Sequence, residues 1–166
     1  MAERRFGYGI AAIVFALDQL TKWIVTGPLQ LQAVRQIEIL PIFRLSWTEN
    51  KGISLGLLNA ETEIGRWMLV AVTGAIAIGV AFWIGREKKR GDQLALGMVL
   101  GGALGNILNR IRFGYVVDFA DLHFGDFRPF LVFNVADAAI SIGVVILLLR
   151  AFLIRDERPK ENVEHA

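Results

Sequence analysis

The sequence predicts an all-α membrane protein, with four transmembrane helices and a small β-sheet cradle outside the membrane. Three observations lead to this fold class. Hydrophobic residues make up 54% of the 166 residues and charged residues only 20%, whereas a soluble domain usually has about 25% charged residues. The charges gather in short segments separated by long apolar runs. One of the polar segments alternates apolar and polar residues, which indicates strands. We expect the chain, 1–166, to form a single integral membrane domain.

Each of the four apolar runs is long enough to cross the hydrocarbon core, which takes about 20 helical residues. The expected spans are 6–25, 64–84, 93–111 and 131–154. The first span does not read as a removable signal peptide, because its apolar stretch is too long and no small-residue cleavage site follows it.

The basic residues predict the direction of the spans. Lysine and arginine cluster compactly at 4–5, 86–90 and 155–160, and four spans place these three segments on one side, which should be the cytoplasm. The segments on the other side, 26–63 and 112–130, hold no such cluster. We therefore expect both termini in the cytoplasm.

The two outer segments differ in pattern. Residues 37–39 and 43–48 alternate apolar and polar side chains on either side of Pro41, as half-buried strands do. They predict a small sheet that rests on the helices or at the lipid interface. The second outer segment, 112–130, is aromatic and punctuated by glycine, and it predicts a short structured loop or an interfacial helix.

Composition narrows the possible chemistry. The chain has no cysteine, which excludes a thiol nucleophile, a disulfide and a thiolate metal site. Its only histidines are His123 and His165, so chemistry built on several imidazoles is nearly excluded. The side-chain groups still available for chemistry are carboxylates, amides, hydroxyls, lysine and arginine.

Polar residues inside the spans converge on one depth. Counted from the outer ends of their spans, Asp18, Asn106 and Asp137 lie at depths of roughly 10, 8 and 9 Å. Ionisable groups inside a membrane are costly, and each suggests a functional site. These three helices therefore predict a polar site near the outer face.

Spacing within each span places its polar residues on one helical face. The groups are Asp18 with Lys22; Asn106 with Asn109 and Arg110; and Asn134 with Asp137 and Ser141. Asp18 and Lys22 could equally form a structural ion pair. Asp137 has no basic neighbour on its own helix, which favours function. A stripe of glycines at 97, 101 and 105 favours close helix packing over chemistry.

A second carboxylate near the outer face suggests an aspartic dyad. Asp118 follows two valines in the second outer segment, although Asp121 and Asp126 are nearby and composition alone does not single it out. Two adjacent carboxyls share one proton. The ionised carboxylate takes a proton from the attacking water, and the protonated one polarises the carbonyl. A serine nucleophile served by His123 is disfavoured, because no serine lies in a glycine-flanked elbow.

Five motifs together resemble the lipoprotein signal peptidase (signal peptidase II) family, intramembrane-type aspartic proteases of bacteria. All five occur in the family's order and extend from the first span to the last. The matching stretches are Asp18–Lys22 (DQLTK), Asn50–Ser54 (NKGIS), Gly101–Arg110 (GGALGNILNR), Val116–Phe119 (VVDF) and Phe133–Asp137 (FNVAD).

The resemblance implies removal of the signal peptide from prolipoproteins whose lipobox cysteine carries diacylglycerol, with cleavage just before that cysteine. It implies Asp118 and Asp137 as catalytic residues, with no metal and no organic cofactor. The implied location is the bacterial inner membrane, with the site near the periplasmic face. The implied partners are the diacylglyceryl prolipoprotein and membrane lipid, without nucleic acid, and a monomer suffices. The other implied residues, which bind substrate or support the site, are Asp18, Lys22, Asn50, Gly52, Gly102, Gly105, Asn106, Asn109, Arg110, Asn134 and Ala136.

Two positions depart from the family pattern, and two other functions compete with it. The family usually has Asp where this chain has Asn109, and Phe where it has Leu55. A proton- or ion-coupled transporter could use buried carboxylates as a relay, but the chain shows no internal repeat and its carboxylates gather near one face. A structural subunit could use the same polar residues only to bind neighbouring helices.

Overall fold

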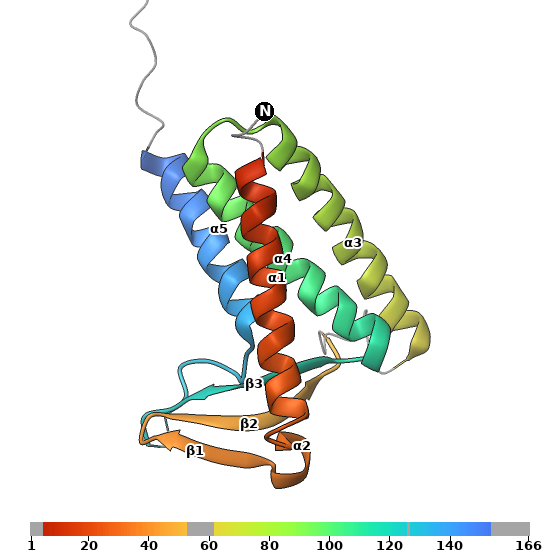
Figure 1. The fold of residues 1–166 in the computed structure, drawn as a ribbon, viewed down its shortest axis with the longest axis vertical. Coiled ribbons are helices and arrows are strands. Elements are labelled where there is room, and N and C mark those ends of the chain that lie inside the picture. The colour runs from red at the N-terminus through yellow and green to blue at the C-terminus, as the bar shows by residue number, and fades with distance from the viewer. Residues whose placement is uncertain (1–4, 53–61, 126, 154–166) are drawn as a thin grey trace, which may run out of the picture.

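The computed structural model describes residues 5–52, 62–125 and 127–153. Four long helices form a bundle, and a small sheet lies at one end of it (Figure 1). The long helices are α1 (Arg5–Thr26), α3 (Glu63–Arg86), α4 (Arg90–Phe113) and α5 (Val135–Leu153). The remaining elements are the one-turn helix α2 (Leu31–Val34) and the strands β1 (Gln36–Leu40), β2 (Phe43–Asn50) and β3 (Val116–Leu122).

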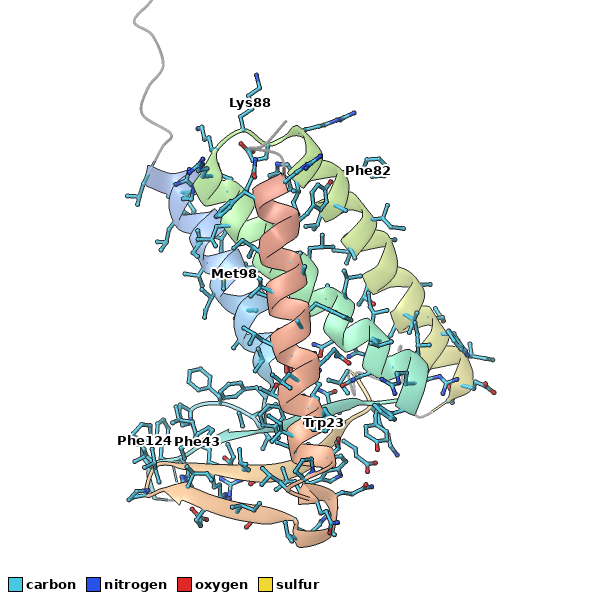
Figure 2. The ribbon with its side chains drawn as sticks, in the orientation of Figure 1. Trp23, Phe43, Phe82, Lys88, Met98 and Phe124 are labelled. Carbon is cyan, nitrogen blue, oxygen red and sulfur yellow. The ribbon has the colours of Figure 1, made fainter. Side chains whose placement is uncertain are left out.

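The four long helices confirm the four predicted spans, since each is long and apolar enough to cross a membrane. α4 is central and packs against α1, α3 and α5. Large apolar side chains point away from the bundle, as Phe82 does on α3 (Figure 2). Helices that remain apolar on their outward faces are typical of membrane spans.

Glycines allow the central helix to approach its neighbours closely. A Cβ on Gly97 would collide with the carbonyl oxygen of Gly7, and one on Gly101 would lie 2.5 Å from that of Ala11. Both contacts are with α1. The predicted packing role of the glycine stripe is therefore confirmed.

The sheet has the order β1-β2-β3 and is antiparallel throughout. The sequence predicted β1 and β2, but it predicted a loop or an interfacial helix where the structure has β3. That prediction failed because β3 is buried along almost its whole length. A strand buried on both faces lacks the alternation that marks a half-buried one.

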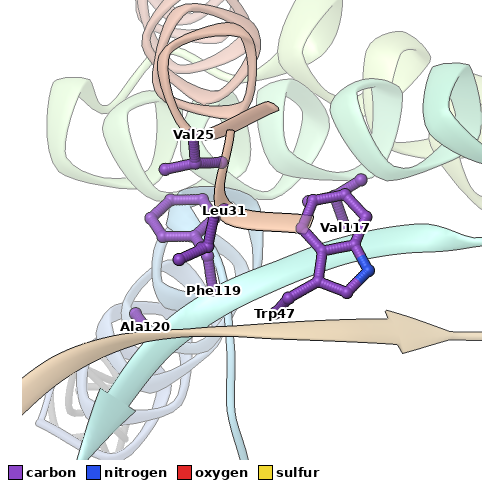
Figure 3. Packing of buried hydrophobic residues seen from close by; sticks show 6 residues of the cluster. All are labelled: Val25, Leu31, Trp47, Val117, Phe119 and Ala120. Atoms are coloured by element: carbon purple, nitrogen blue, oxygen red, sulfur yellow. The ribbon is translucent and has the colours of Figure 1, made fainter. Parts of the chain in front are cut away.

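An apolar cluster holds the sheet against the end of α1 (Figure 3). Its members come from α1, α2, β2 and β3, and they are Val25, Leu31, Trp47, Val117, Phe119 and Ala120. The cluster joins both outer segments to the bundle and thereby places β3 beside the ends of the helices.

The first turn of α1, the connection between α3 and α4 and the last turn of α5 lie together at the end of the bundle away from the sheet (Figure 1). Lys88 marks this end in Figure 2. The helix α5 begins at Val135, four residues later than the predicted span, because Phe133 pairs with Ala120 of β3. Leu55 lies outside the described residues.

Candidate active site

Asn134 is a capping residue and does not lie within the fourth span. Its side-chain oxygen accepts a hydrogen bond from the Asp137 N–H at 3.0 Å, and its own N–H donates to Asp137 Oδ2 at 3.2 Å. This reciprocal pair is a capping box at the start of α5. The three-residue spacing that predicted a shared helical face therefore marks the helix start, and Asp137 lies in the first turn.

The side-chain amide of Asn134 connects the two predicted catalytic aspartates. Its Nδ2 donates to Asp118 Oδ1 at 2.6 Å, while its side-chain oxygen binds the N–H of Asp137 and its backbone N–H binds the Asp137 carboxylate. Asn134 is fully buried. Asn134 thus contacts both carboxylates, that of Asp118 on β3 through its side-chain amide and that of Asp137 on α5 through its backbone N–H.

Asn106 of α4 holds the second oxygen of Asp137. Its Nδ2 donates to Asp137 Oδ1 at 2.8 Å, and its Oδ1 accepts from Lys22 Nζ at 3.0 Å. Because the ammonium can only donate, it fixes the orientation of the Asn106 amide.

Asp18 and Lys22 form a buried pair that serves the site. Lys22 Nζ donates to Asp18 Oδ2 at 2.9 Å, and Asp18 Oδ1 accepts from the N–H of Ala136 at 3.1 Å. The Asp18 carboxylate therefore lies at the positive N-terminus of α5, where an anion is stabilised. The pair is structural, and its structural role is to hold Asn106 and the first turn of α5.

The outer cradle contributes Asn50 to the other aspartate. Asn50 Nδ2 donates to Asp118 Oδ2 at 3.0 Å, and its own oxygen accepts from the N–H of Gly52 at 2.9 Å. Gly52 has a φ of 110°, which favours glycine. The motif residues Asn50 and Gly52 thus form a turn that directs one amide at Asp118.

The environment of Asp118 raises its pKa. The side chain is 2% exposed. Burial, and next the negative charge of Asp137, raise the pKa of Asp118 to about 6, although Asn50 and Asn134 donate to it. A carboxyl with such a pKa exchanges a proton near neutral pH, as a general acid or base must.

The neighbouring Asp121 differs from Asp118 in its hydrogen-bond partners and in the direction in which its pKa is shifted. Its Oδ2 accepts from Arg44 Nε at 2.8 Å and from Ser46 Oγ at 3.1 Å. Burial alone would raise the pKa of Asp121, but these hydrogen bonds outweigh it and the pKa is lowered. His123 Nε2 lies 3.8 Å from Glu38 Oε2 on β1, which places this side chain beside β1.

Asn109 and Arg110 follow Asn106 on α4. Asn109 is buried, and its Oδ1 accepts from the N–H of Val117 at 3.2 Å, which anchors β3 next to Asp118. An amide provides this acceptor without burying a charge. Arg110 lies close enough to interact electrostatically with Asp137 and Asp118. Its buried Nε has no hydrogen-bond partner among the described residues.

The two glycines predicted at the site contact it through packing. A Cβ on Gly105 would collide with the Asp18 carboxylate, and one on Gly102 would lie 2.5 Å from the carbonyl oxygen of Ala136. Gly105 and Gly102 therefore let α4 fit against the support of the site and against the first turn of α5.

A groove opens beside Asp137. It has a volume of about 260 Å³ and is lined by Phe130, Phe133, Asp137, Ala138, Ser141 and Ile142. A larger cavity of about 490 Å³ between α1 and α4 includes none of the predicted site residues. Across 5–52, 62–125 and 127–153 there is no cluster of three or more metal-ligating His, Cys, Asp or Glu side chains.

The structure thus brings the predicted site residues together around two aspartates, and it adds Gln19. Gln19 Nε2 donates to Asp18 Oδ2 at 2.9 Å and to the Gly105 carbonyl at 3.4 Å. Sequence reasoning did not assign Gln19 to the site, although Gln19 follows Asp18 in the DQLTK motif. The Asn134–Asp137 capping box had a recognisable spacing, with an acidic side chain three positions after a residue of N-cap type.

A bundle of four long apolar helices, with a hydrogen-bonded polar site where it meets a small sheet, is the fold of a known class of membrane enzyme. The fold is similar to a solved bacterial membrane enzyme determined by the in meso method, with a TM-score of 0.77, 26% identity and 93% of both chains covered. The family model for signal peptidase (SPase) II matches residues 10–153. The chain belongs to this family of proteases.

Curated relatives agree with the family. The chain is 60% identical over 153 residues to a lipoprotein signal peptidase of Sphingopyxis alaskensis, covering 92% of this chain and 88% of the relative. It is 57% identical over 163 residues to one of Rhizorhabdus wittichii, covering 98% and 95%. The resemblance drawn from the five motifs is confirmed, and the transporter is not favoured.

Proposed function

We propose that this chain is an aspartic endopeptidase that removes signal peptides from diacylglyceryl-modified prolipoproteins, cutting before the lipidated cysteine. The observation that carries the catalytic type is the single amide of Asn134, which bonds Asp118 and orients Asp137. Family membership supports the prolipoprotein substrate.

Asp118 and Asp137 would share one proton and titrate as a unit. Burial and the charge of Asp137 raise the pKa of Asp118 to about 6, which favours a shared proton on the pair. The ionised carboxylate takes a proton from water as the water oxygen bonds to the scissile carbonyl carbon, and the protonated carboxyl gives its proton to the carbonyl oxygen. The C–N bond of the resulting diol then breaks as one of the diol hydroxyls gives its proton to the carboxylate that is now ionised. The cysteine nitrogen leaves as an amine with a proton returned by the dyad.

The supporting residues would keep this geometry fixed. Asn106 and Asn134 hold the carboxylates in place, and Lys22 fixes the Asn106 amide. Arg110, with a buried Nε that is unpaired within the described part of the chain, is a candidate donor to the substrate backbone. Fixed donors need no rearrangement during the reaction, which lowers its barrier.

We place the protein in the bacterial inner membrane, with both termini in the cytoplasm and the site near the periplasmic face. The basic segments support this orientation, because the Arg86–Arg90 connection lies at the end of the bundle opposite the sheet, and positive loops stay in the cytoplasm. A substrate arriving along the membrane would reach Asp137 through the groove on α5.

Incubation of the purified full chain with a diacylglyceryl prolipoprotein tests the proposal. Wild type should release the signal peptide, and Asp118→Asn and Asp137→Asn should remain folded but abolish release. Glu38→Gln is the control, because Glu38 is an exposed carboxylate of the same sheet. Cleavage by either aspartate variant at the wild-type rate would rule out the dyad.

A further inference from the structure

We propose that a pocket at the far end of β3 binds the first residues of the mature lipoprotein, those that follow the scissile bond. This inference rests on the function proposed above. The pocket has a volume of about 270 Å³ and is lined by Asp121 and the segment Arg128–Val132.

Asp121 brings an unused hydrogen-bond acceptor to the pocket. The side chain is 1% exposed, and its Oδ2 is bonded to Arg44 and Ser46. Its Oδ1 is buried with no partner among the described residues. A buried acceptor without a donor costs free energy, and a ligand N–H that reached it would recover that cost.

Arg128 brings available donors. Its side chain is 51% exposed, and its Nη1 is 3.8 Å from Asp121 Oδ2, an oxygen that Arg44 already binds at 2.8 Å. Arg44 thus balances the charge of Asp121, and Arg128 can turn its guanidinium toward another acceptor. One acceptor and one set of donors match the N–H and C=O of a peptide unit.

The pocket adjoins the catalytic groove. Phe130 lines both the groove that contains Asp137 and the pocket that contains Asp121. The groove follows α5 toward the bilayer, while the pocket lies on the sheet outside the spans. A substrate crossing the site would therefore have its apolar signal peptide on the bilayer side and its polar mature segment on the sheet side.

The length of β3 sets the expected register. Asp118 and Asp121 are three residues apart on one strand, a separation of roughly 10 Å. An extended peptide rises by about 3.3 Å per residue. The pocket should therefore contact the substrate roughly three residues beyond the scissile bond.

Two lipidated substrates test the inference, identical up to the cysteine. The short one ends there as an amide, and the long one carries five further polar residues. Wild type should show a KM for the long substrate lower by on the order of tenfold, the effect of a hydrogen bond to a charged group. Arg128→Ala should raise the KM for the long substrate part of the way to that of the short one, with kcat nearly unchanged, because Asp121 still accepts a peptide N–H. N-methylation of single peptide bonds in the long substrate should raise KM most near the third residue.

Arg112→Ala is the matched control, because Arg112 is an exposed arginine on the sheet side that does not line the pocket. This variant should keep the lower KM of wild type for the long substrate. Equal KM values for both substrates in wild type, or the same KM in the Arg128 and Arg112 variants, would overturn the inference and leave the proposed function intact. If wild type cleaves neither substrate, the proposed function itself fails.

Discussion

Replacing Asp118 by asparagine should abolish cleavage without weakening the fold at neutral pH. Burial and the charge of Asp137 raise the pKa of Asp118 from 3.8 to about 6. A shift of that size means that ionisation costs the folded state about 3 kcal/mol, at about 1.4 kcal/mol per pH unit. The substituted amide carries no charge but has one acceptor oxygen in place of two, and that loss costs about 1.5–3 kcal/mol. The variant should therefore be as stable as wild type or up to about 1.5 kcal/mol more stable.

The pH dependence of stability separates the cost of ionising Asp118 from ordinary packing effects. Because the folded pKa lies above the unfolded one, the folded state binds more protons, and wild type gains stability as pH falls through about 6 toward 3.8. Between about pH 7.5 and pH 5 this gain amounts to about 1.4 kcal/mol, or about 3–6 °C in Tm for a chain of this size. Asp118→Asn has no carboxyl group to take up a proton at this position, so its Tm relative to wild type should fall as pH falls.

Asp121→Asn is the matched control on the same strand. The pKa of Asp121 is lowered, so its ionised form stabilises the fold above its unfolded pKa, and this contribution is lost only below about pH 4. The variant should be less stable than wild type by the same amount near pH 7.5 and near pH 5. Thermal unfolding of the three proteins in one detergent measures these differences. An Asp118→Asn offset that does not change with pH would refute the reasoning.

Substitutions at three further positions test the supports of the site. Asn134→Ala should lower Tm by removing a cap worth about 1 kcal/mol and should reduce kcat strongly, because both aspartates lose a partner; a normal kcat would count against its positioning role. Gly105→Ala should lower the free energy of unfolding by about 1–3 kcal/mol, because the added Cβ overpacks against Asp18. Gly74→Ala is the control, since nothing lies within 4 Å of its added Cβ, and it should leave the free energy of unfolding unchanged or raise it. Asn109→Asp should retain cleavage because an oxygen still accepts the Val117 N–H. Asn109→Leu should lower the free energy of unfolding by about 1–3 kcal/mol, because that buried N–H loses its partner. Equal stability of the two variants would contradict the anchoring role.

Much of the site could be predicted because its residues leave local signals. Asp18, Asn106 and Asp137 are polar residues in otherwise apolar helices, and such residues are visible in one dimension. The spacing of Asp18 and Lys22 predicts their contact, which the structure has at 2.9 Å. These inferences depend only on the rise and period of a helix.

Other features had no local signal. Asp118 and Asp121 stand in similar sequence surroundings, yet one is held by Asn50 and Asn134 and the other by Arg44. Their partners lie 16 to 77 residues away in sequence. The strand β3 was missed for a related reason, since burial on both faces removed the alternation expected of a strand.

The sequence by itself determined the membrane class, the four spans and the list of polar residues, because hydropathy and helical spacing are local properties. Only the tertiary structure decided what those residues do. It joined Asp18 to the N–H of Ala136, 118 residues away, and it made Asn134 the link between the aspartates. The physical reason is that the chemistry of a carboxyl group depends on burial and on nearby donors and charges. Those are set by the packing of distant segments and not by the residues next to it in the chain.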